Sequence, residues 1–399
     1  MARDAERRGR IQDALCEAGL DAVACALPVD VLLLTGYWPV VGTALALATR
    51  DGRTAVLVPE DEVPLADRSG ADEIRPFQLG SLHDLRTVGD ALRQPLAEAI
   101  HALRIERARI GYERGGLFEP ATYAAMFLYG ARLSEWIGAA APAATLVAAD
   151  DLLLRLRAVK TSHEVSRIRT ACQIAAQAFQ NGKGLICAGL RETEVAVRFG
   201  APLSTVGTGY QGIERAGGFT FCMSGPNSAH AHGAYARSRA RPIALGDLVL
   251  VHCNSYADGF WTDITRTYCL GDGDRRQWAL FTAVLAASAA AIGTIRPGAR
   301  ARQVDHAARD ILSTQGFGDQ FKHSTGHGVG FAAINHNAPP RLHPCSEDIL
   351  EAGMVFNVEP AIYIDGYGGL RHCTMVAVTP TGAEVLTPFQ SSFEHLRVA

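Results

Sequence analysis

The sequence lacks the features that direct a chain to a nucleic acid, a membrane or a secretion pathway. Its 38 basic and 41 acidic residues nearly balance and no block of lysine and arginine stands out, so neither a nucleic acid nor an anionic membrane is an expected partner. The most apolar stretches, residues 136–149 and 279–295, contain a proline or are rich in alanine, and both fall short of a membrane span. The first ten residues are charged and contain no apolar core of a secretion signal.

Paired cysteines are absent as well. The nine cysteines are an odd number without a C-x-x-C spacing, which indicates reduced thiols and a cytoplasmic location. The chain contains no short tandem repeat and no low-complexity segment. Its 399 residues are 48% apolar and 20% charged, a composition typical of a soluble globular enzyme or binding protein, and they are too many for one ordinary core. The sequence therefore predicts two domains.

Residues 1–150 are expected to form a small α/β domain. A helical pattern over residues 7–20 is followed by a strand at 21–27, and two apolar runs within 43–60 are joined through Asp51-Gly52, a strong hairpin signal. Few titratable residues cluster in this half of the chain. We expect it to shape and cover a site rather than to supply the chemistry.

Residues 151–399 form the second predicted domain. Thr161 and Glu164 make a capping box at the start of a helix that is expected to end at Asn181-Gly182. Helical patterns then alternate with groups of strands. The histidines and carboxylates that could carry chemistry gather in four segments: 224–233, 248–268, 321–340 and 353–378.

These segments are more informative together than alone, because a lone histidine is more often a structural residue than a ligand. Two apolar strands each end in a metal-capable side chain, His252 in "LVLVH" and Glu359 in "MVFNVE", and two other segments supply His327 and Cys373. Burying carboxylates and imidazoles together is costly unless a cation or matched hydrogen bonds compensate. The pattern therefore indicates a metal site or a tightly bonded polar cluster.

Five motifs occur in the order of a known family. They are G-x-N-x-x-x-x-H at 225–232, G-x-x-x-D-I-T-R-T at 259–267, G-H-G-V-G at 326–330, V-E-P at 358–360 and G-G-L-R at 368–371. Through them the second domain resembles metallopeptidase family M24, which includes methionine aminopeptidase, aminopeptidase P and prolidase, with creatinase and ectoine hydrolase as relatives. The first domain resembles the creatinase-type N-terminal domain. The resemblance implies an α+β protein whose residues 151–399 adopt the pita-bread fold with a pseudo-twofold antiparallel sheet.

The resemblance also implies five metal-ligand positions. In the metal-dependent members, two aspartates, one histidine and two glutamates hold two divalent ions. Carried over to this sequence, the aspartate positions are His252 and Asp263, the histidine is His327, and the glutamate positions are Glu359 and Cys373. Two of the five ligand positions are therefore altered.

The altered positions predict one divalent ion per chain rather than two. A close pair of divalent ions carries four positive charges, and only the carboxylates of Asp263 and Glu359 remain to balance them. Ligation by histidine, carboxylate and thiolate favours zinc or iron over a manganese pair. The alternative is that no metal is bound, as in creatinase, although creatinase also lacks the equivalent of Asp263, which this chain keeps.

The activity that the resemblance implies is hydrolysis of a C–N bond in a small substrate, an Xaa-Pro dipeptide or another small amide or amidine, by a metal-activated water. Glu359 would act as the base. His232 and His336 match the family's two substrate histidines, although His336 lies two residues later than usual. Arg371 would bind a substrate carboxylate or pair with Asp263.

Three other interpretations stay open. The first is a metal-independent enzyme like creatinase or ectoine hydrolase. The second is a lyase that acts on a small zwitterion, similar to the dimethylsulfoniopropionate lyase of this fold, and the third is a binding module without activity. A small-molecule substrate is the expected partner of either enzyme, and by resemblance alone the chain is expected to form a homodimer.

Overall fold

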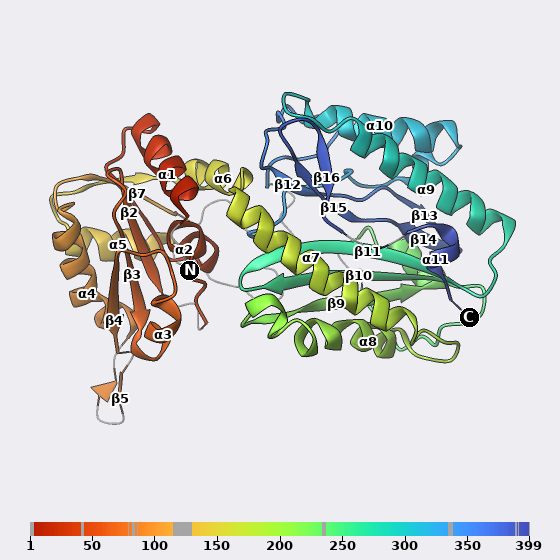
Figure 1. Cartoon of the computed structure of the whole chain (residues 1–399), viewed down its shortest axis with the longest axis horizontal. Coiled ribbons are helices and arrows are strands. Elements are labelled where there is room, and N and C mark those ends of the chain that lie inside the picture. Colours follow the sequence, from red (N-terminus) through yellow and green to blue (C-terminus); the bar gives the residue numbers. More distant parts are fainter. Residues whose placement is uncertain are drawn as a thin grey trace. The chain divides into compact units, whose positions relative to one another are not determined.

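The structure is a computed structural model, and it describes residues 4–40, 44–78, 80–81, 84–85, 87–114, 130–233, 237–333, 338–387, 389 and 391–398. The chain divides into two compact units, residues 1–157 and 158–399 (Figure 1). The sequence predicts this division after residue 150. Within the described ranges, no helix combines the length and the hydropathy that a membrane span requires.

The first unit is built on a six-stranded mixed sheet with the strand order β4-β3-β2-β1-β7-β8. In that order the strands span Glu73–Phe77, Thr54–Pro59, Leu45–Thr49, Ala22–Cys25, Arg109–Tyr112 and Thr145–Ala148. The predicted hairpin is present, because β2 and β3 pair antiparallel around a turn in which Gly52 has a φ of 88°. The strand expected at 21–27 is β1, which pairs antiparallel with β2 and parallel with β7.

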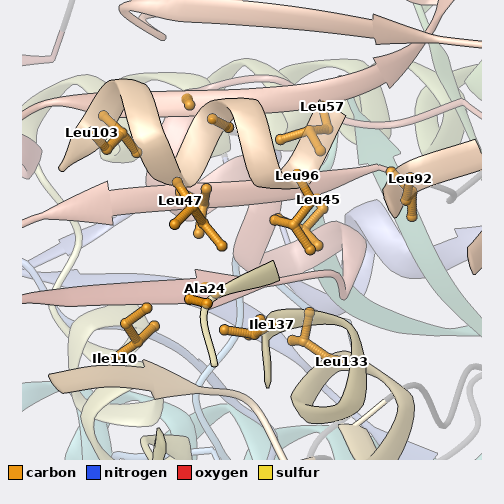
Figure 2. Close-up of a cluster of buried hydrophobic side chains, with 14 of the residues drawn as sticks. Ala24, Leu45, Leu47, Leu57, Leu92, Leu96, Leu103, Ile110, Leu133 and Ile137 are labelled. Atoms are coloured by element: carbon orange, nitrogen blue, oxygen red, sulfur yellow. The ribbon is translucent and has the colours of Figure 1, made fainter. Parts of the chain in front are cut away.

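Helices complete the first unit. They are α1 (Ala5–Glu17), α2 (Pro28–Thr35), α3 (Val63–Ala66), α4 (Val88–Leu103), α5 (Gly130–Ala140) and α6 (Asp150–Ala158), with the short strands β5 (Gly80–Ser81) and β6 (Asp84–Leu85) as a separate pair. Figure 2 shows Leu92, Leu96 and Leu103 of α4 beside the leucines of β2 and β3. Their spacing of four and seven residues places them on one face of α4, and this face is buried in the core.

The second unit contains two successive sets of helices and strands. The first set is α7 (Ser162–Lys183), α8 (Glu192–Thr205), β9 (Ala216–Ser224), β10 (Leu248–Ala257) and β11 (Phe260–Leu270). The second set is α9 (Arg275–Gly293), α10 (Ala301–Thr314), β12 (Val355–Val358), β13 (Ala361–Ile364), β14 (Gly368–Arg371), β15 (Thr374–Val378) and β16 (Ala383–Val385). The short elements α11 (Phe393–Leu396) and β17 (Arg397–Val398) follow.

Antiparallel pairing dominates this unit. The strands β9, β10, β11 and β17 form one sheet, β12, β15 and β16 form a second, and β13 pairs with β14. A bridge between Thr265 and Cys373 joins the two sets of strands. The helices α7 and α8 pack on β9–β11, and α9 packs on α10 and on β12–β14 (Figure 1). This is the predicted α+β architecture.

One predicted helix boundary is wrong. The capping box is present, since Thr161 Oγ1 accepts from Glu164 N at 3.2 Å and Glu164 Oε2 accepts from Thr161 N at 2.9 Å. However, α7 does not end at Asn181-Gly182 but continues to Lys183. A Cβ on Gly182 would lie 2.6 Å from the ring of Phe199. Glycine at this position therefore permits close packing of α7 on α8 instead of ending the helix.

Candidate functional site

The hairpin of β10 and β11 brings His252 and Asp263 to one face of the sheet. The two turn residues between the strands have positive φ values of 47° and 86°, as a tight hairpin turn of type I′ requires. In the resulting register, His252 lies opposite Thr265 and Asn254 lies opposite Asp263. Because opposite residues and residues two apart share a face, these four side chains lie on the same side of the hairpin.

Backbone contacts between two loops bring His327 and Glu359 close to each other. His327 N donates to Asn357 Oδ1 at 2.7 Å, and Glu359 N donates to Thr325 O at 2.8 Å. A Cβ on Gly326 would lie only 1.9 Å from Asn357 O, so no larger residue fits there. The first glycine of the G-H-G-V-G motif therefore allows the histidine loop to pack against the end of β12.

Cys373 joins this group between β14 and β15. Its Sγ lies 3.1 Å from Asp263 O and 3.6 Å from Asp263 Oδ1. The carboxylate of Asp263 also lies 3.7 Å from His252 Nδ1 and 3.6 Å from His327 Nε2. Ligand atoms of Asp263, Glu359 and Cys373 all lie within 4.8 Å of one another. The structure thus gathers the five ligand positions carried over from the family around Asp263.

His327 is oriented by its hydrogen bonds with Nε2 toward the cluster. Its Nδ1 lies 3.1 Å from Gly328 O, so Nδ1 carries a proton and donates it to this carbonyl. Its Nε2 lies 3.6 Å from Asp263 Oδ2 and 3.4 Å from Asn357 Nδ2. Burial alone would lower the pKa of His327, but the hydrogen bond to Asp263 and its negative charge raise it.

His252 is held differently. Its Nδ1 lies 2.9 Å from Thr265 Oγ1 and its Nε2 lies 3.0 Å from Asn254 Oδ1, so both ring nitrogens are hydrogen-bonded to the protein. Burial lowers the pKa of His252 to about 4. The ring is therefore neutral near pH 7, and both of its nitrogens are engaged by Thr265 and Asn254.

Burial and charge shift the pKa values of the other three groups in different directions. Burial alone would raise the pKa of Asp263, but the two neighbouring imidazoles hold it at about 2. Burial and the charge of Asp263 raise the pKa of Glu359 to about 7, while Arg371 opposes the rise. Burial raises the pKa of the Cys373 thiol well above its ordinary value. Near neutral pH the cluster therefore holds one ionised carboxylate, one carboxyl group able to exchange a proton, and a neutral thiol.

Arg371 is buried beside the cluster, with 8% of its surface exposed. Its Nη1 lies 3.8 Å from Glu359 Oε2, and its Nε donates to Thr265 Oγ1 at 3.1 Å. The ion-pair partner of Arg371 is therefore Glu359 rather than Asp263, the partner considered from the sequence.

His232 lies in an exposed turn after the 3-10 helix Gly225–His230. Its ring meets that of Tyr363 edge-on at a centroid distance of 5.1 Å, and Tyr363 Oη lies 3.0 Å from His323 Nε2. Partial burial and the charge of Lys322 lower the pKa of His232. The other expected substrate histidine, His336, lies outside the described residues.

Two buried carboxylates that the sequence analysis missed hold the loops of the site. Glu192 on α8 accepts from Ser224 N and Oγ at 2.7 and 2.8 Å, and from Asn227 Nδ2 at 2.7 Å. Asp305 on α10 accepts from Thr325 N and Oγ1 at 3.0 and 2.8 Å. Glu192 lies in the first turn of α8, where acidic residues are common, and Asp305 follows the first turn of α10, so nothing in the sequence distinguishes these two from surface residues.

The first unit contains a second buried group of possible ligands, Cys25, Asp30 and Glu113. Here Arg157 Nη1 lies 2.8 and 3.0 Å from the two carboxylate oxygens of Asp30. Burial and the charge of Asp30 raise the pKa of Glu113 well above its ordinary value. The guanidinium thus supplies a positive charge to this group from within the protein.

The fold and the site define a class of protein: a mixed α/β unit precedes an antiparallel α+β unit that gathers carboxylates, imidazoles and a thiol around one aspartate. Residues 166–380 match the model of metallopeptidase family M24, and residues 7–159 match the creatinase/prolidase N-terminal domain. The chain belongs to metallopeptidase family M24. The predicted family and the predicted pita-bread architecture are confirmed.

Similar proteins include several dipeptidases. The chain is 36% identical over 238 residues to the Xaa-Pro dipeptidase of Pyrococcus furiosus, a match that covers 60% of this chain and 65% of that protein, less than two thirds of its length. It is 29% identical over 389 residues to a putative dipeptidase of Bacillus subtilis, covering 95% of this chain and 97% of the relative. The structure of the prolidase from Pyrococcus horikoshii superposes with a TM-score of 0.75 at 26% identity, covering 97% and 99% of the two chains. The structure of the Xaa-Pro dipeptidase from Bacillus anthracis superposes with a TM-score of 0.77 at 26% identity, covering 98% of this chain and 99% of that one.

Proposed function

We propose that the protein hydrolyses a C–N bond in a small, dipeptide-like substrate and uses one divalent ion per chain. The observation that supports this most directly is the convergence of His327, Glu359 and Cys373 around Asp263, within the distances given above. The relatives named Xaa-Pro dipeptidase and prolidase support the substrate class.

The side chains around Asp263 fit a single ion. Asp263, Glu359 and Cys373 offer three ligand atoms within 4.8 Å of one another, and His327 Nε2 lies 3.6 Å from Asp263 Oδ2. An imidazole that donates its other N–H to a backbone carbonyl is oriented for ligation in the way metal sites commonly use. Carboxylate, imidazole and thiolate ligands suit zinc or ferrous iron better than manganese.

A second ion does not fit equally well. Its remaining ligand would be His252, and both ring nitrogens of His252 are already hydrogen-bonded to Thr265 and Asn254. Two divalent ions would also place four positive charges against the two carboxylates of Asp263 and Glu359. These two arguments favour one ion.

When bound, the ion would polarise the scissile carbonyl and activate a water molecule. Glu359, with its pKa raised to about 7 mainly by burial, would accept a proton from the attacking water and return it to the leaving nitrogen. His232 would donate a hydrogen bond to the oxygen on which negative charge develops. Arg371 would bind a carboxylate of the substrate, and His336 would act on the leaving group.

A metal-independent hydrolase is the second candidate, because the cluster can also balance its own charges. Arg371 lies 3.8 Å from Glu359, and Asp263 lies beside His327, whose pKa it raises against the effect of burial. Arg371 and His327 thus stand beside the two carboxyl groups of the cluster. In this candidate the same Glu359 and His232 would carry the proton transfers.

We further propose a cytoplasmic location and a homodimer. The first rests on the nine cysteines without a C-x-x-C pair, and the second rests on the family resemblance alone. Light scattering on the purified full chain would measure the mass of the particle in solution, and a monomer would contradict the second proposal.

Metal analysis combined with a substrate panel tests the proposed function. The full chain, purified without chelators, is assayed on Xaa-Pro dipeptides beside creatine and ectoine, before and after chelation. The proposal expects dipeptide hydrolysis that chelation abolishes and zinc or ferrous iron restores. Hydrolysis that survives chelation would establish the metal-independent candidate instead, and Asp263→Asn is the control that should bind no metal.

A further inference from the structure

A chain of hydrogen bonds runs from Arg371 to a buried amide. Arg371 Nε donates to Thr265 Oγ1 at 3.1 Å, Thr265 Oγ1 lies 2.9 Å from His252 Nδ1, and His252 Nε2 lies 3.0 Å from Asn254 Oδ1. Because a carboxamide oxygen only accepts, Nε2 of the imidazole must carry the proton. In the neutral ring Nδ1 then accepts from the hydroxyl of Thr265. Each donor in this series of hydrogen bonds has an acceptor, up to the amide nitrogen of Asn254.

The Nδ2 group of Asn254 ends the chain without a partner. Asn254 is 2% exposed, and no described residue accepts a hydrogen bond from this amide nitrogen. Leaving a buried donor unsatisfied costs free energy, so native proteins keep few such groups. An acceptor supplied by a ligand would satisfy it.

Aromatic side chains lie beside Asn254 on the same face of the sheet. In the sheet register, Asn254 lies opposite Asp263 on β11 and opposite Phe219 on β9. The rings of Phe219 and Trp261 are parallel within 2° at a centroid distance of 6.5 Å, and the ring of Phe221 stacks on His252 at 6.3 Å. All three aromatic side chains are partly exposed. A polar donor beside an apolar wall is the usual composition of a small-molecule site.

The chemistry of this subsite differs from that of one built for a free amino group. An ammonium group only donates hydrogen bonds, whereas Asn254 Nδ2 is a donor and both ring nitrogens of His252 are in use; the remaining acceptor beside them is the carboxylate of Asp263, which would be a ligand of the proposed ion. A carbonyl oxygen would accept from Nδ2. The end of the site opposite Arg371 therefore suits an acylated nitrogen better than a free one.

We propose that Asn254, with Phe219, Phe221 and Trp261, selects substrates whose acyl-side residue is N-acylated and carries an apolar or aromatic side chain. The amide nitrogen of Asn254 donates to the oxygen of the N-acyl group, and the rings contact the side chain. The inference rests on the proposed function, because Arg371 then binds the carboxylate at the other end of the same substrate. It names a substrate class that the family resemblance does not imply.

The test compares N-acetyl-Phe-Pro with Phe-Pro. Binding is measured by calorimetry on the full chain carrying Glu359→Gln, in which the proposed base is removed, and kcat and KM are measured on the wild type. We expect N-acetyl-Phe-Pro to bind about tenfold more tightly than Phe-Pro, the effect of one hydrogen bond. N-acetyl-Gly-Pro should bind more weakly than N-acetyl-Phe-Pro, and equal affinity would overturn the role of the aromatic residues.

Substitutions at Asn254 sharpen the comparison. Asn254→Asp keeps an acceptor for His252 but replaces the donor with a second acceptor, so the preference should reverse toward the free ammonium of Phe-Pro. Asn254→Leu should abolish the preference. Ser255→Ala is the control, because Ser255 is the next residue on β10 and bonds to Thr262 Oγ1 at 2.6 Å on the other face; it should keep the wild-type preference.

The outcomes separate the inference from the proposed function. The role of Asn254 would be overturned by an unchanged preference in Asn254→Asp. Equal binding of N-acetyl-Phe-Pro and Phe-Pro to the protein with Asn254 intact would overturn it as well. If a thermal unfolding scan shows that the Asn254 variants do not fold, the ratio of the two peptide affinities, measured on the protein with Asn254 intact, still decides. Absence of hydrolysis with the expected binding preference would contradict the proposed function while supporting the subsite.

Discussion

At the level of single residues, protons determine how the cluster around Asp263 would accept an ion. The pKa values of His327 and Glu359 are both raised, and so is the pKa of the Cys373 thiol. Ligation requires each donor to lose its proton, so metal affinity should fall as the solution becomes more acidic.

His232 provides the first prediction at this scale. His232→Ala should reduce turnover by about a hundredfold, the usual effect of removing one donor to the developing oxyanion. Metal content and thermal stability should hardly change, because His232 is exposed and its ring packs edge-on against that of Tyr363. Elemental analysis and an unfolding scan beside the assay check this. Loss of metal in the variant would show that His232 has a structural role.

The pH dependence of stability provides the second prediction. The pKa of Glu359 is raised from 4.5 to about 7, so its contribution to the free energy of unfolding is full below pH 4.5 and is lost as the pH rises through 7. The pKa of His252 is lowered from 6.5 to about 4, so its contribution is full above pH 6.5 and is lost as the pH falls through 4. Between pH 4.5 and 6.5 the two effects oppose each other.

Removing one of the two groups should reveal the other. In the presence of a chelator, the free energy of unfolding of Glu359→Gln should increase as the pH rises from 4.5 to 6.5, because only the effect of His252 remains. The free energy of unfolding of His252→Asn should decrease as the pH rises over the same range, because only the effect of Glu359 remains. Unfolding temperatures measured at steps of pH check both variants. Parallel curves for wild type and Glu359→Gln would contradict the raised pKa.

At the level of elements, the two halves of the second unit use the same device to hold a functional loop. In the first half, Glu192 on α8 accepts both the N–H and the hydroxyl of Ser224, at the start of the loop that leads to His232. In the second half, Asp305 on α10 accepts hydrogen bonds from the N–H and the hydroxyl of Thr325, two residues before His327. One helix carboxylate in each half thus fixes the backbone from which a functional histidine projects.

These two carboxylates should have separable effects. Glu192→Gln should reduce turnover by tenfold or more while metal is retained, because the carboxamide nitrogen would face the donors of Ser224 or Asn227, and a buried mismatch costs about 1–3 kcal/mol. Asp305→Asn should instead weaken metal retention through the loop of His327. Metal content and kcat of both variants check this.

The matched controls are Glu194→Gln on α8 and Asp310→Asn on α10, which change more exposed carboxylates of the same helices. Both should resemble the wild type. If Glu192→Gln lost metal and Asp305→Asn kept it, the assignment of one loop to each carboxylate would be wrong.

Elements also show what the sequence could and could not predict. The Asp51-Gly52 turn and the capping box at Thr161 were predictable because each depends on a few adjacent residues. The role of Gly182 was not, since it depends on Phe199, a contact between two helices. The hydrogen bonds of His252 to Thr265 and Asn254 required the register of β10 on β11, which no local pattern specifies.

At the level of the whole molecule, the proposed chemistry belongs to one part of the chain. All five ligand positions lie in residues 158–399, and the buried acidic group of the first unit is balanced by Arg157. The order of five motifs was sufficient to predict the family and the α+β fold. The one ion per chain that the sequence predicts follows from the charge count at the two altered positions, and no local pattern gives the distances and hydrogen bonds on which ion binding depends.

The number of metal ions per chain is therefore the most direct measurement of the central claim. We expect one ion in the wild-type chain, held around Asp263, His327 and Glu359. His252→Asp together with Cys373→Glu should restore two carboxylates, bind a second ion and shift the preference toward manganese. Elemental analysis of both proteins, purified in parallel without chelators, gives the two numbers. Two ions in the wild type, none in the wild type, or one in the double variant would contradict the account.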